Sequence, residues 1–363
     1  MTGRTSSLDR MNELGIFAAD WIDRTRRAIA SGAVARQHER QPGLVDSYGR
    51  LGFADLVTDT GIRLDYLGQA LSAGRPLLFV DHLAWLKVSL AARQLPVDFV
   101  ETNLQCIREE LAEALPAECV ELTEATIQES LEGLAEAPSE SQQVLVDGDP
   151  YVDLARRYLL ATLEGRREDA LALILAAADQ GATTDDLHTW VLQRVQAEIG
   201  RMWQIGDVHA AEEHFASRIA ERAISLLHAR EPRVEPHGRK VLVACVGGND
   251  HDLGARMVGD RFEMSGWRTI LLGANSPSYD LARSVIDFDV DLVALSAALT
   301  LHVRSTHEAI RAIRALPERA NTPILVGGRP FQIVDDLWQV VGADGSAATP
   351  ADAVLAADRL VRS

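Results

Sequence analysis

The sequence predicts an α/β fold joined to all-α regions, and three observations support this prediction. Apolar runs typical of strands alternate with helical periodicity over the last third of the 363 residues. Helical periodicity alone fills the first two thirds, and glycine or serine follows most of the apolar runs. Alternating strands and helices predict a doubly wound parallel sheet, Rossmann-like, which binds ligands at the carboxyl ends of its strands.

The acidic composition narrows the classes of function. A net charge of −17 argues against direct DNA binding, which usually requires a basic surface. We expect no membrane partner and no signal peptide, because no apolar run reaches the length of a membrane span and residues 1–10 are polar. Cys106, Cys119 and Cys245 have no metal-like spacing, which indicates reduced thiols and a cytoplasmic protein.

The first two thirds of the chain are expected to form two helical domains. Residues 1–148 show helical periodicity at 8–30, 44–71, 76–93, 99–114 and 124–134, and residues 137–141 look like a linker. Residues 149–230 continue the periodicity with short breaks at 164–166 and 181–184, which predicts an antiparallel four-helix bundle. The polar segment 230–238 contains proline and links this bundle to the last domain.

Residues 238–363 are expected to form the sheet domain. Strands are predicted at 240–246, 269–272, 292–295 and 323–326, and helices at 253–265, 279–287, 303–315 and 350–361. Gly247, Gly273, Ser296 and Gly327 fall at the ends of the predicted strands. Because parallel strands end at the same edge of a sheet, we expect the ligand to bind near these residues.

The run from Asn249 to Gly254 follows the first predicted strand and is the most informative stretch of the chain. His251 on such a strand-to-helix loop can leave the surface and coordinate a metal, and Gly254 lets a bulky planar ligand approach the backbone. Taken alone, His251 could equally be an ordinary surface histidine.

Together with Ser296-Ala297-Ala298-Leu299 and Gly327-Gly328, this run resembles the base-off, His-on cobalamin-binding module. That module has the pattern Asp/Glu-x-His-x-x-Gly, then Ser-x-Leu, then Gly-Gly. The resemblance implies that His251 is the lower axial ligand of cobalt and that its loop contacts the cofactor through Asn249, Asp250, Leu253 and Gly254. It also implies a slot for the nucleotide tail, made by Ser296, Leu299, Thr300, Gly327 and Gly328. Asn249 departs from the pattern, because it stands where the family has an acid and carries no charge.

A second group of residues lies in the predicted bundle. Trp203 falls near the end of one helix, and Glu213 and His214 near the start of the next, so a short connection brings them together. A helix-packing tryptophan and a capping glutamate are the alternative. The Trp-x9-Glu-His spacing resembles that of light-sensing cobalamin proteins, which implies that the three side chains surround the adenosyl group of adenosylcobalamin. Gln204 stands where the best-known members have a histidine that binds cobalt once the adenosyl group is lost; His209 and His214 are the substitutes nearby.

Asp81 and His82 stand out in the N-terminal domain. A buried Asp–His pair beside Trp85 could hydrogen-bond the pyrrole nitrogens of a linear tetrapyrrole, with aromatic walls for its rings. The arrangement of the whole chain resembles that of photocobilins, cobalamin photoreceptors that also bind a bilin such as biliverdin. A structural His82 and a helix-packing Trp85 are the alternative.

These resemblances imply a photoreceptor rather than an enzyme. Light would break the cobalt–carbon bond and change the conformation or the oligomeric state, so we expect a homodimer and a downstream protein partner of unknown identity. The alternative is a corrinoid methyl carrier for a methyltransferase, which has the same architecture. The Trp-x9-Glu-His pattern and the extra N-terminal domain argue against it. A subunit of an adenosylcobalamin mutase fits poorly, because no barrel domain is predicted.

Overall fold

The computed structural model describes residues 13–43, 52–96 and 98–362. The chain forms two compact units. Unit 1 contains the described residues up to Glu140 together with Leu299–His307 and Arg329–Val341. Unit 2 contains Ser141–Ala298, Glu308–Gly328 and Gly342–Ser363, of which the last residue is not described. None of the described helices is both long enough and apolar enough to cross a membrane.

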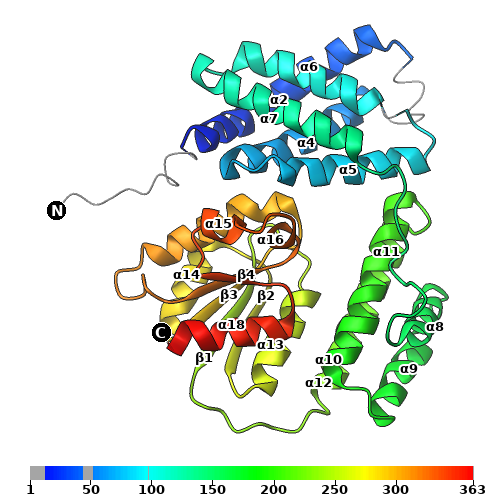
Figure 1. Cartoon of the computed structure of the whole chain (residues 1–363), viewed down its shortest axis with the longest axis vertical. Coiled ribbons are helices and arrows are strands. Elements are labelled where there is room, and N and C mark those ends of the chain that lie inside the picture. Colours follow the sequence, from blue (N-terminus) through cyan, green and yellow to red (C-terminus); the bar gives the residue numbers. More distant parts are fainter. Residues whose placement is uncertain (1–12, 44–51, 97, 363) are drawn as a thin grey trace. The chain divides into compact units, whose positions relative to one another are not determined.

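Unit 1 is built mainly from helices, as predicted (Figure 1). They are α2 (Glu13–Arg40), α4 (Phe53–Ala73), α5 (Leu77–Ala92), α6 (Asp98–Ala114) and α7 (Ala117–Glu136). Helix α2 continues beyond the predicted end at Ala30, because Ala33, Val34 and Gln37 extend its buried face. The predicted starts at Leu8 and Leu44 lie outside the described residues. Helix α7 begins directly after Pro116, earlier than predicted.

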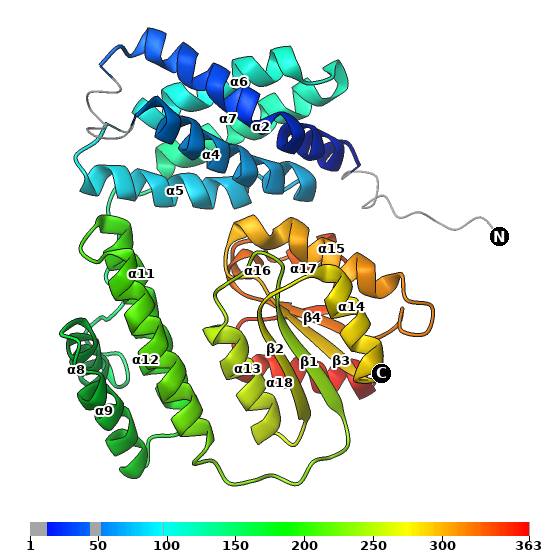
Figure 2. The same ribbon diagram turned by 180° about the vertical axis from the view of Figure 1, so that it is seen from behind.

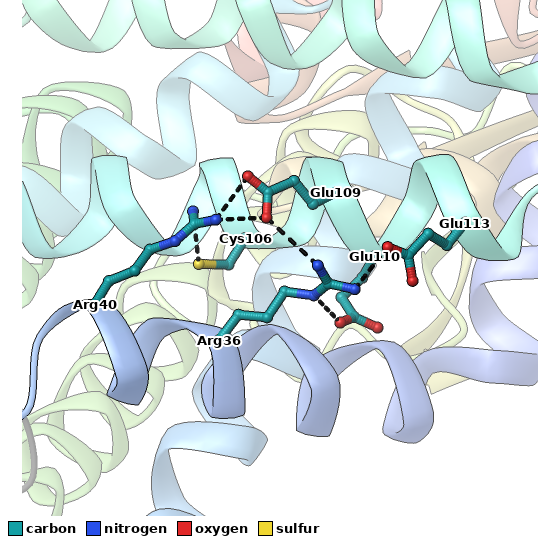
Figure 3. Close-up of polar contacts among 6 residues, drawn as sticks. All are labelled: Arg36, Arg40, Cys106, Glu109, Glu110 and Glu113. Atoms are coloured by element: carbon teal, nitrogen blue, oxygen red, sulfur yellow. Dashed lines mark hydrogen bonds and ion pairs between the residues drawn. The ribbon is translucent and has the colours of Figure 1, made fainter.

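Charged contacts fix helix α2 against helix α6. Arg36 and Arg40 of α2 reach three glutamates of α6, namely Glu109, Glu110 and Glu113 (Figure 3). The Arg36–Glu113 pair measures 2.8 Å and the Arg40–Glu109 pair 2.6 Å. The pairs repeat along both helices and therefore define the register between them.

Ion pairs also hold the two later segments of unit 1 to its helices. Arg304 contacts Asp20 and Asp23, Arg329 contacts Asp81, and Arg75 contacts Asp336. The backbone amide of Arg304 donates to the Gln69 side chain at 2.8 Å. The segments that follow strands β3 and β4 are thus part of the unit formed by the N-terminal helices.

Unit 2 contains a parallel sheet of five strands with the order β2-β1-β3-β4-β5. The strands are β1 (Lys240–Val246), β2 (Arg268–Ser276), β3 (Leu292–Ser296), β4 (Ile324–Gly327) and β5 (Gly345–Ala347). Helices α13 (Leu253–Met264) and α18 (Pro350–Arg362) pack on one face, and α14 (Ser278–Asp287) lies on the other side (Figure 1). This is the doubly wound fold that the sequence predicts. The connections after β3 and β4 contain the 3-10 turn η2 (Thr300–His302), helix α15 (Val303–Arg314) and the short helices α16 (Arg329–Ile333) and α17 (Leu337–Val340). Of these, η2, α16 and α17 belong to unit 1.

Two details of the sheet differ from the prediction. Strand β2 does not end before Gly273 but continues to Ser276. Gly273 has a φ of 81°, and the pairing with β1 shifts register there, so the strand bends instead of ending. Strand β5 was not predicted, because it has only three residues and no apolar run.

The remaining helices of unit 2 form the predicted bundle (Figure 2). They are α8 (Val152–Leu163), α9 (Arg167–Asp179), α10 (Thr184–Asp186), the π-helix η1 (Leu187–Leu192), α11 (Gln193–Ile205) and α12 (Ala210–His228). Elements α10, η1 and α11 follow one another without a break and act as one long helix. The core of the whole bundle includes the buried residues Tyr158, Ile174, Val195 and Ile219.

His188 makes the stability of this bundle depend on pH. The side chain is buried, and burial, with a smaller contribution from the charge of His228, lowers the pKa of His188 to about 4. In the unfolded chain a histidine takes up its proton near pH 6.5, so protons favour unfolding as the pH falls from about 6.5 towards 4. We expect His188 to cost about 2 kcal/mol of unfolding free energy between pH 7 and pH 5. Urea unfolding of the wild type and of His188→Gln at both pH values measures this; an equal loss in the two proteins would contradict it.

Candidate functional site

A cavity of about 690 Å³ lies in unit 2, between the helical bundle and the carboxyl ends of the strands. Helices α11 and α12 supply one wall, through residues that include Trp203, Glu213 and His214. The loops after β1, β3 and β4 supply the other wall, through residues that include His251, Ser296 and Gly328. The structure therefore brings the two groups of predicted residues to one place.

Asn249 shapes the loop that carries His251. The residue is fully buried, and its side-chain amide donates to the carbonyl of Ser296 at 3.0 Å. Its side-chain oxygen accepts a hydrogen bond from the backbone amide of His251 at 3.1 Å. Asn249 thus bridges the ends of β1 and β3 and holds the loop by its backbone. Both polar ends of the amide are occupied by these contacts, so Asn249 positions the backbone rather than the imidazole ring.

The loop that carries His251 faces the cavity. His251 is exposed, and Asp250, Leu253 and Gly254 line the cavity beside it. Asp252 accepts a hydrogen bond from Arg256 at 2.9 Å, one turn along α13. The Arg256 contact therefore holds one carboxylate oxygen of Asp252 at the start of α13.

The two glycines at the end of β4 lie so close to neighbouring carbonyl groups that a side chain would clash there. Gly328 has a φ of 108°, and a Cβ atom there would lie 2.0 Å from the carbonyl oxygen of Ala297. A Cβ atom at Gly327 would lie 3.0 Å from the carbonyl oxygen of Ala347. Ser296 pairs with Gly327 across the sheet. The predicted tail slot therefore begins at strand ends where a side chain in place of Gly328 would clash with the backbone.

Leu299 and Thr300 continue the chain from the end of β3 and belong to unit 1. Thr300 is buried, and its hydroxyl has no hydrogen-bond partner among the described residues. A buried polar group without a partner costs stability unless a ligand or water satisfies it. Thr300 thus fits a binding role, while the structure does not place it among the residues that line the cavity.

The helical wall carries a chain of polar side chains that the sequence analysis did not anticipate. The Ser217 hydroxyl contacts the carboxylate of Glu213 at 2.8 Å and the side-chain oxygen of Gln196 at 3.2 Å. The second carboxylate oxygen of Glu213 lies 3.6 Å from Nε2 of His214. Ser217 follows Glu213 by one helical turn, and this spacing is the signal that could have identified it.

Trp203 and Gln204 point in different directions although they are neighbours. Trp203 is 44% exposed and lines the cavity, near the end of α11 where Gly206 turns the chain with a φ of 86°. Gln204 is only 8% exposed and is not among the residues that line the cavity. Successive residues on a helix are about 100° apart, which explains the difference.

The bilin residues predicted in the N-terminal domain belong to unit 1, and none of them is among the residues that line the cavity of unit 2. The carboxylate of Asp81 pairs with Arg329. The ring of His82 stacks on Tyr66 with 3.7 Å between centroids, and Trp85 lies nearly parallel at 6.5 Å. Burial lowers the pKa of His82 to about 3, with a smaller effect from Arg63, so the imidazole is neutral at physiological pH.

The donor set limits the kind of metal that could bind. Among the described residues no group of three or more histidine, cysteine, aspartate and glutamate side chains could hold a metal ion. All three cysteines are free and buried. A metal bound by His251 must therefore bring most of its ligands with it, as a metal in a macrocycle does. The exposed imidazole, the open cavity and the glycine-lined strand ends fit a corrinoid.

Comparisons with known proteins agree with this geometry. Residues 239–356 and residues 154–228 each match a family model described as a B12 binding domain. The chain is 30% identical over 222 residues to the HTH-type transcriptional repressor CarH of Myxococcus xanthus, which covers 59% of this chain and 71% of CarH. A corrinoid protein of Desulfitobacterium hafniense is 23% identical over 210 residues, or 55% of this chain and 94% of that protein.

The fold is also similar to the solved structure of the monomethylamine corrinoid protein of Methanosarcina barkeri. The TM-score is 0.52 at 17% identity, and the match covers 58% of this chain and all of that one. This likeness supports the predicted fold class, and the alignment with CarH shows the family. The chain therefore belongs to the cobalamin-dependent photoreceptor family, together with the repressor CarH.

Proposed function

We propose that this cobalamin-binding protein is a light sensor that holds adenosylcobalamin in the cavity of unit 2. His251 would hold the cobalt, and Trp203, Glu213 and His214 would hold the adenosyl group. The observation that carries this proposal is the cavity itself, because these four residues line it from opposite walls. Ser296, Gly327 and Gly328 of unit 2 receive the nucleotide tail.

Each wall has a distinct part in the proposed function. When bound, adenosylcobalamin supplies a cobalt–carbon bond that light can break. Trp203 offers a flat apolar surface to the adenosyl group, and the Glu213 carboxylate, held by Ser217, can accept hydrogen bonds from its hydroxyl groups. Trp203 and Glu213 would hold the adenosyl group against the helical wall, so the contact of α11 and α12 with the sheet loops would depend on whether that group is present.

The proposed output is a change of conformation or oligomeric state that a protein partner senses. A net charge of −17 does not favour direct DNA binding by this chain. A homodimer is the simplest assembly, and a sensor rather than an enzyme fits the relation to a repressor.

A corrinoid methyl carrier is the second candidate function. It is supported by the similarity to the Desulfitobacterium protein and to the dimethylamine corrinoid proteins of Methanosarcina acetivorans, one of which is 24% identical over 166 residues. Trp203 lines the helical wall of the cavity and favours the sensor, because a bulky adenosyl group is large enough to fill the space beside it and a methyl group is not.

The two functions are separated by one spectroscopic experiment. The protein is mixed with adenosylcobalamin in the dark, desalted and illuminated with green light. A sensor retains the cofactor and its absorption spectrum changes on illumination, with a change in mass by size-exclusion chromatography. Retention without any response to light would favour the methyl carrier.

His251→Ala tests the lower ligand. We expect the absorption spectrum of bound cobalamin to move away from the His-on form, because an imidazole nitrogen is lost from cobalt. If the variant has the same spectrum as the wild type, His251 is not the ligand of cobalt. The exposed position of His251 means that the variant should fold normally, which circular dichroism can check.

Trp203→Ala tests the upper wall. We expect the photolysis yield to change because the adenosyl radical is less well confined, while the affinity in the dark stays within about tenfold. The yield is measured by absorption after a calibrated light pulse. Equal yields in variant and wild type would remove Trp203 from the mechanism.

A bilin in unit 1 extends the proposal to red light. The parallel rings of Tyr66, His82 and Trp85 support it, because a planar conjugated ligand stacks on such a surface. The pairing of Asp81 with Arg329 means that Asp81 must change partner to bind pyrrole nitrogens. Biliverdin added to the protein should give a red-shifted absorption band that survives desalting and weakens in Trp85→Ala. A band lost on desalting would rule out this part of the proposal.

A further inference from the structure

We propose that two copies of the chain form a homodimer by antiparallel pairing of strand β2 with β2 of the second copy. The interface is the outer edge of the strand, around Thr269, Ile270 and Leu271. This inference rests on the homodimer named in the proposed function and adds to it the surface through which the two copies meet. Its test needs neither cobalamin nor light.

The two edge strands of the sheet differ in length. The strand order places β2 at one edge and β5 at the other. Strand β5 has three residues, whereas β2 has nine and pairs only with β1 among the described residues. Proteins commonly keep edge strands short, charged or covered, because unpaired backbone groups there attract another strand. Strand β5 is protected by its shortness, and β2 is not.

The backbone of β2 directs hydrogen-bonding groups outward. The amide of Arg268 donates to the carbonyl of Arg239 at 2.9 Å, so Arg268 faces β1. Because the direction alternates along a strand, Ile270 also faces β1, and the N–H and C=O groups of Thr269 and Leu271 face away from it. A two-fold axis at Ile270 places Thr269 of one copy opposite Leu271 of the other. Their backbones then exchange hydrogen bonds in both directions.

The charge of β2 favours a second copy as the partner. The chain has a net charge of −17, so most of its surface repels another copy. The sequence from Thr269 to Tyr279 contains no charged residue, and Arg268 is the single charged residue of β2. Antiparallel pairing places the two Arg268 side chains at opposite ends of the ladder. Two copies can therefore meet along β2 without bringing like charges face to face.

The side chains at this edge are already held in place. Leu271 is 38% exposed although it is apolar, and its side chain lies beside Gly259 of α13. The Thr269 hydroxyl donates to the carbonyl of Gly259 at 3.3 Å. Thr269 and Leu271 thus share the face of the sheet that α13 covers. Across the proposed axis, Leu271 of one copy packs on Thr269 of the other and loses its exposure to water.

The other end of β2 reaches the loop that carries His251. The side-chain oxygen of Asn275 accepts a hydrogen bond from the backbone amide of Gly248 at 2.7 Å. The backbone amide of Asn275 donates to the carbonyl of Asn249 at 2.9 Å. The proposed interface and the loop that would hold cobalamin therefore share one strand. This gives the proposed change of oligomeric state a structural route, from the loop through β2 to the second copy.

The first test measures the mass of the full chain without cobalamin, by size-exclusion chromatography with light scattering over a range of protein concentrations. The wild type should have the mass of a dimer. Leu271→Lys should raise the dissociation constant of the dimer about 10-fold or more, because it places charge in the centre of the interface. Leu355→Lys is the matched control: Leu355 is 56% exposed on α18, which packs beside β5 at the opposite edge of the sheet, so this variant should stay dimeric.

A mixing experiment separates the interface from a loss of folding. Leu271→Lys and Leu271→Glu should each be monomeric, and their mixture should form a heterodimer, because opposite charges then meet near the axis. Hydrogen exchange in the wild type tests the backbone without any substitution. The amide of Thr269 should exchange slowly in the dimer and faster on dilution to the monomer, whereas the amide of Ile270, which faces β1, should stay slow in both.

The outcomes distinguish this inference from the function on which it rests. A wild type that is monomeric at every concentration overturns the inference. A dimer that persists in Leu271→Lys, or that weakens equally in Leu355→Lys, also overturns it, because the interface then lies elsewhere. None of the residues Thr269, Ile270 and Leu271 lines the cavity, so retention of adenosylcobalamin is measured independently. A monomer that retains cobalamin refutes the dimer alone, and a dimer that does not retain it refutes the cofactor proposal alone.

Discussion

The cavity depends on the way helix α12 is held beside helix α13. Arg256 of α13 contacts Glu221 of α12 at 3.0 Å and Asp252, the residue after His251, at 2.9 Å. One guanidinium therefore ties the helical wall to the loop that carries His251. These groups are partly exposed, so each pair contributes about 1 kcal/mol or less, and their importance lies in where they act. A shift of α12 changes the surroundings of Asp252 and, with it, the loop below the cavity.

Different ion pairs join the C-terminal ends of α12 and α13. His228 near the end of α12 contacts Glu263 at 2.9 Å and Asp260 at 3.5 Å, both near the end of α13. Burial raises the pKa of Asp260 to about 6, with a smaller opposing effect from His228. This end of α12 is tied to α13 by ion pairs, whereas the cavity end carries the exposed Trp203.

The sequence predicted the parts of this site that depend on the backbone. Parallel strands end at one edge, so Ser296 and Gly328 could be placed near His251 before any contact was known. The polar relay could not be predicted, because it depends on how α11 and α12 are rotated: a turn of one residue would separate Gln196 from Ser217. Strand β5 and the bend at Gly273 escaped prediction because pairing, rather than an apolar pattern, defines them.

The two departures from the family pattern share one physical consequence. Asn249 and Gln204 are amides where the pattern has ionisable groups, and both are buried. A buried charge is costly unless it is paired, whereas an amide can satisfy a loop or a helix contact without that cost. Asn249 and Gln204 therefore have a structural role and take no part in the chemistry of the site. The chemistry of the site must therefore come from the exposed side chains that line the cavity.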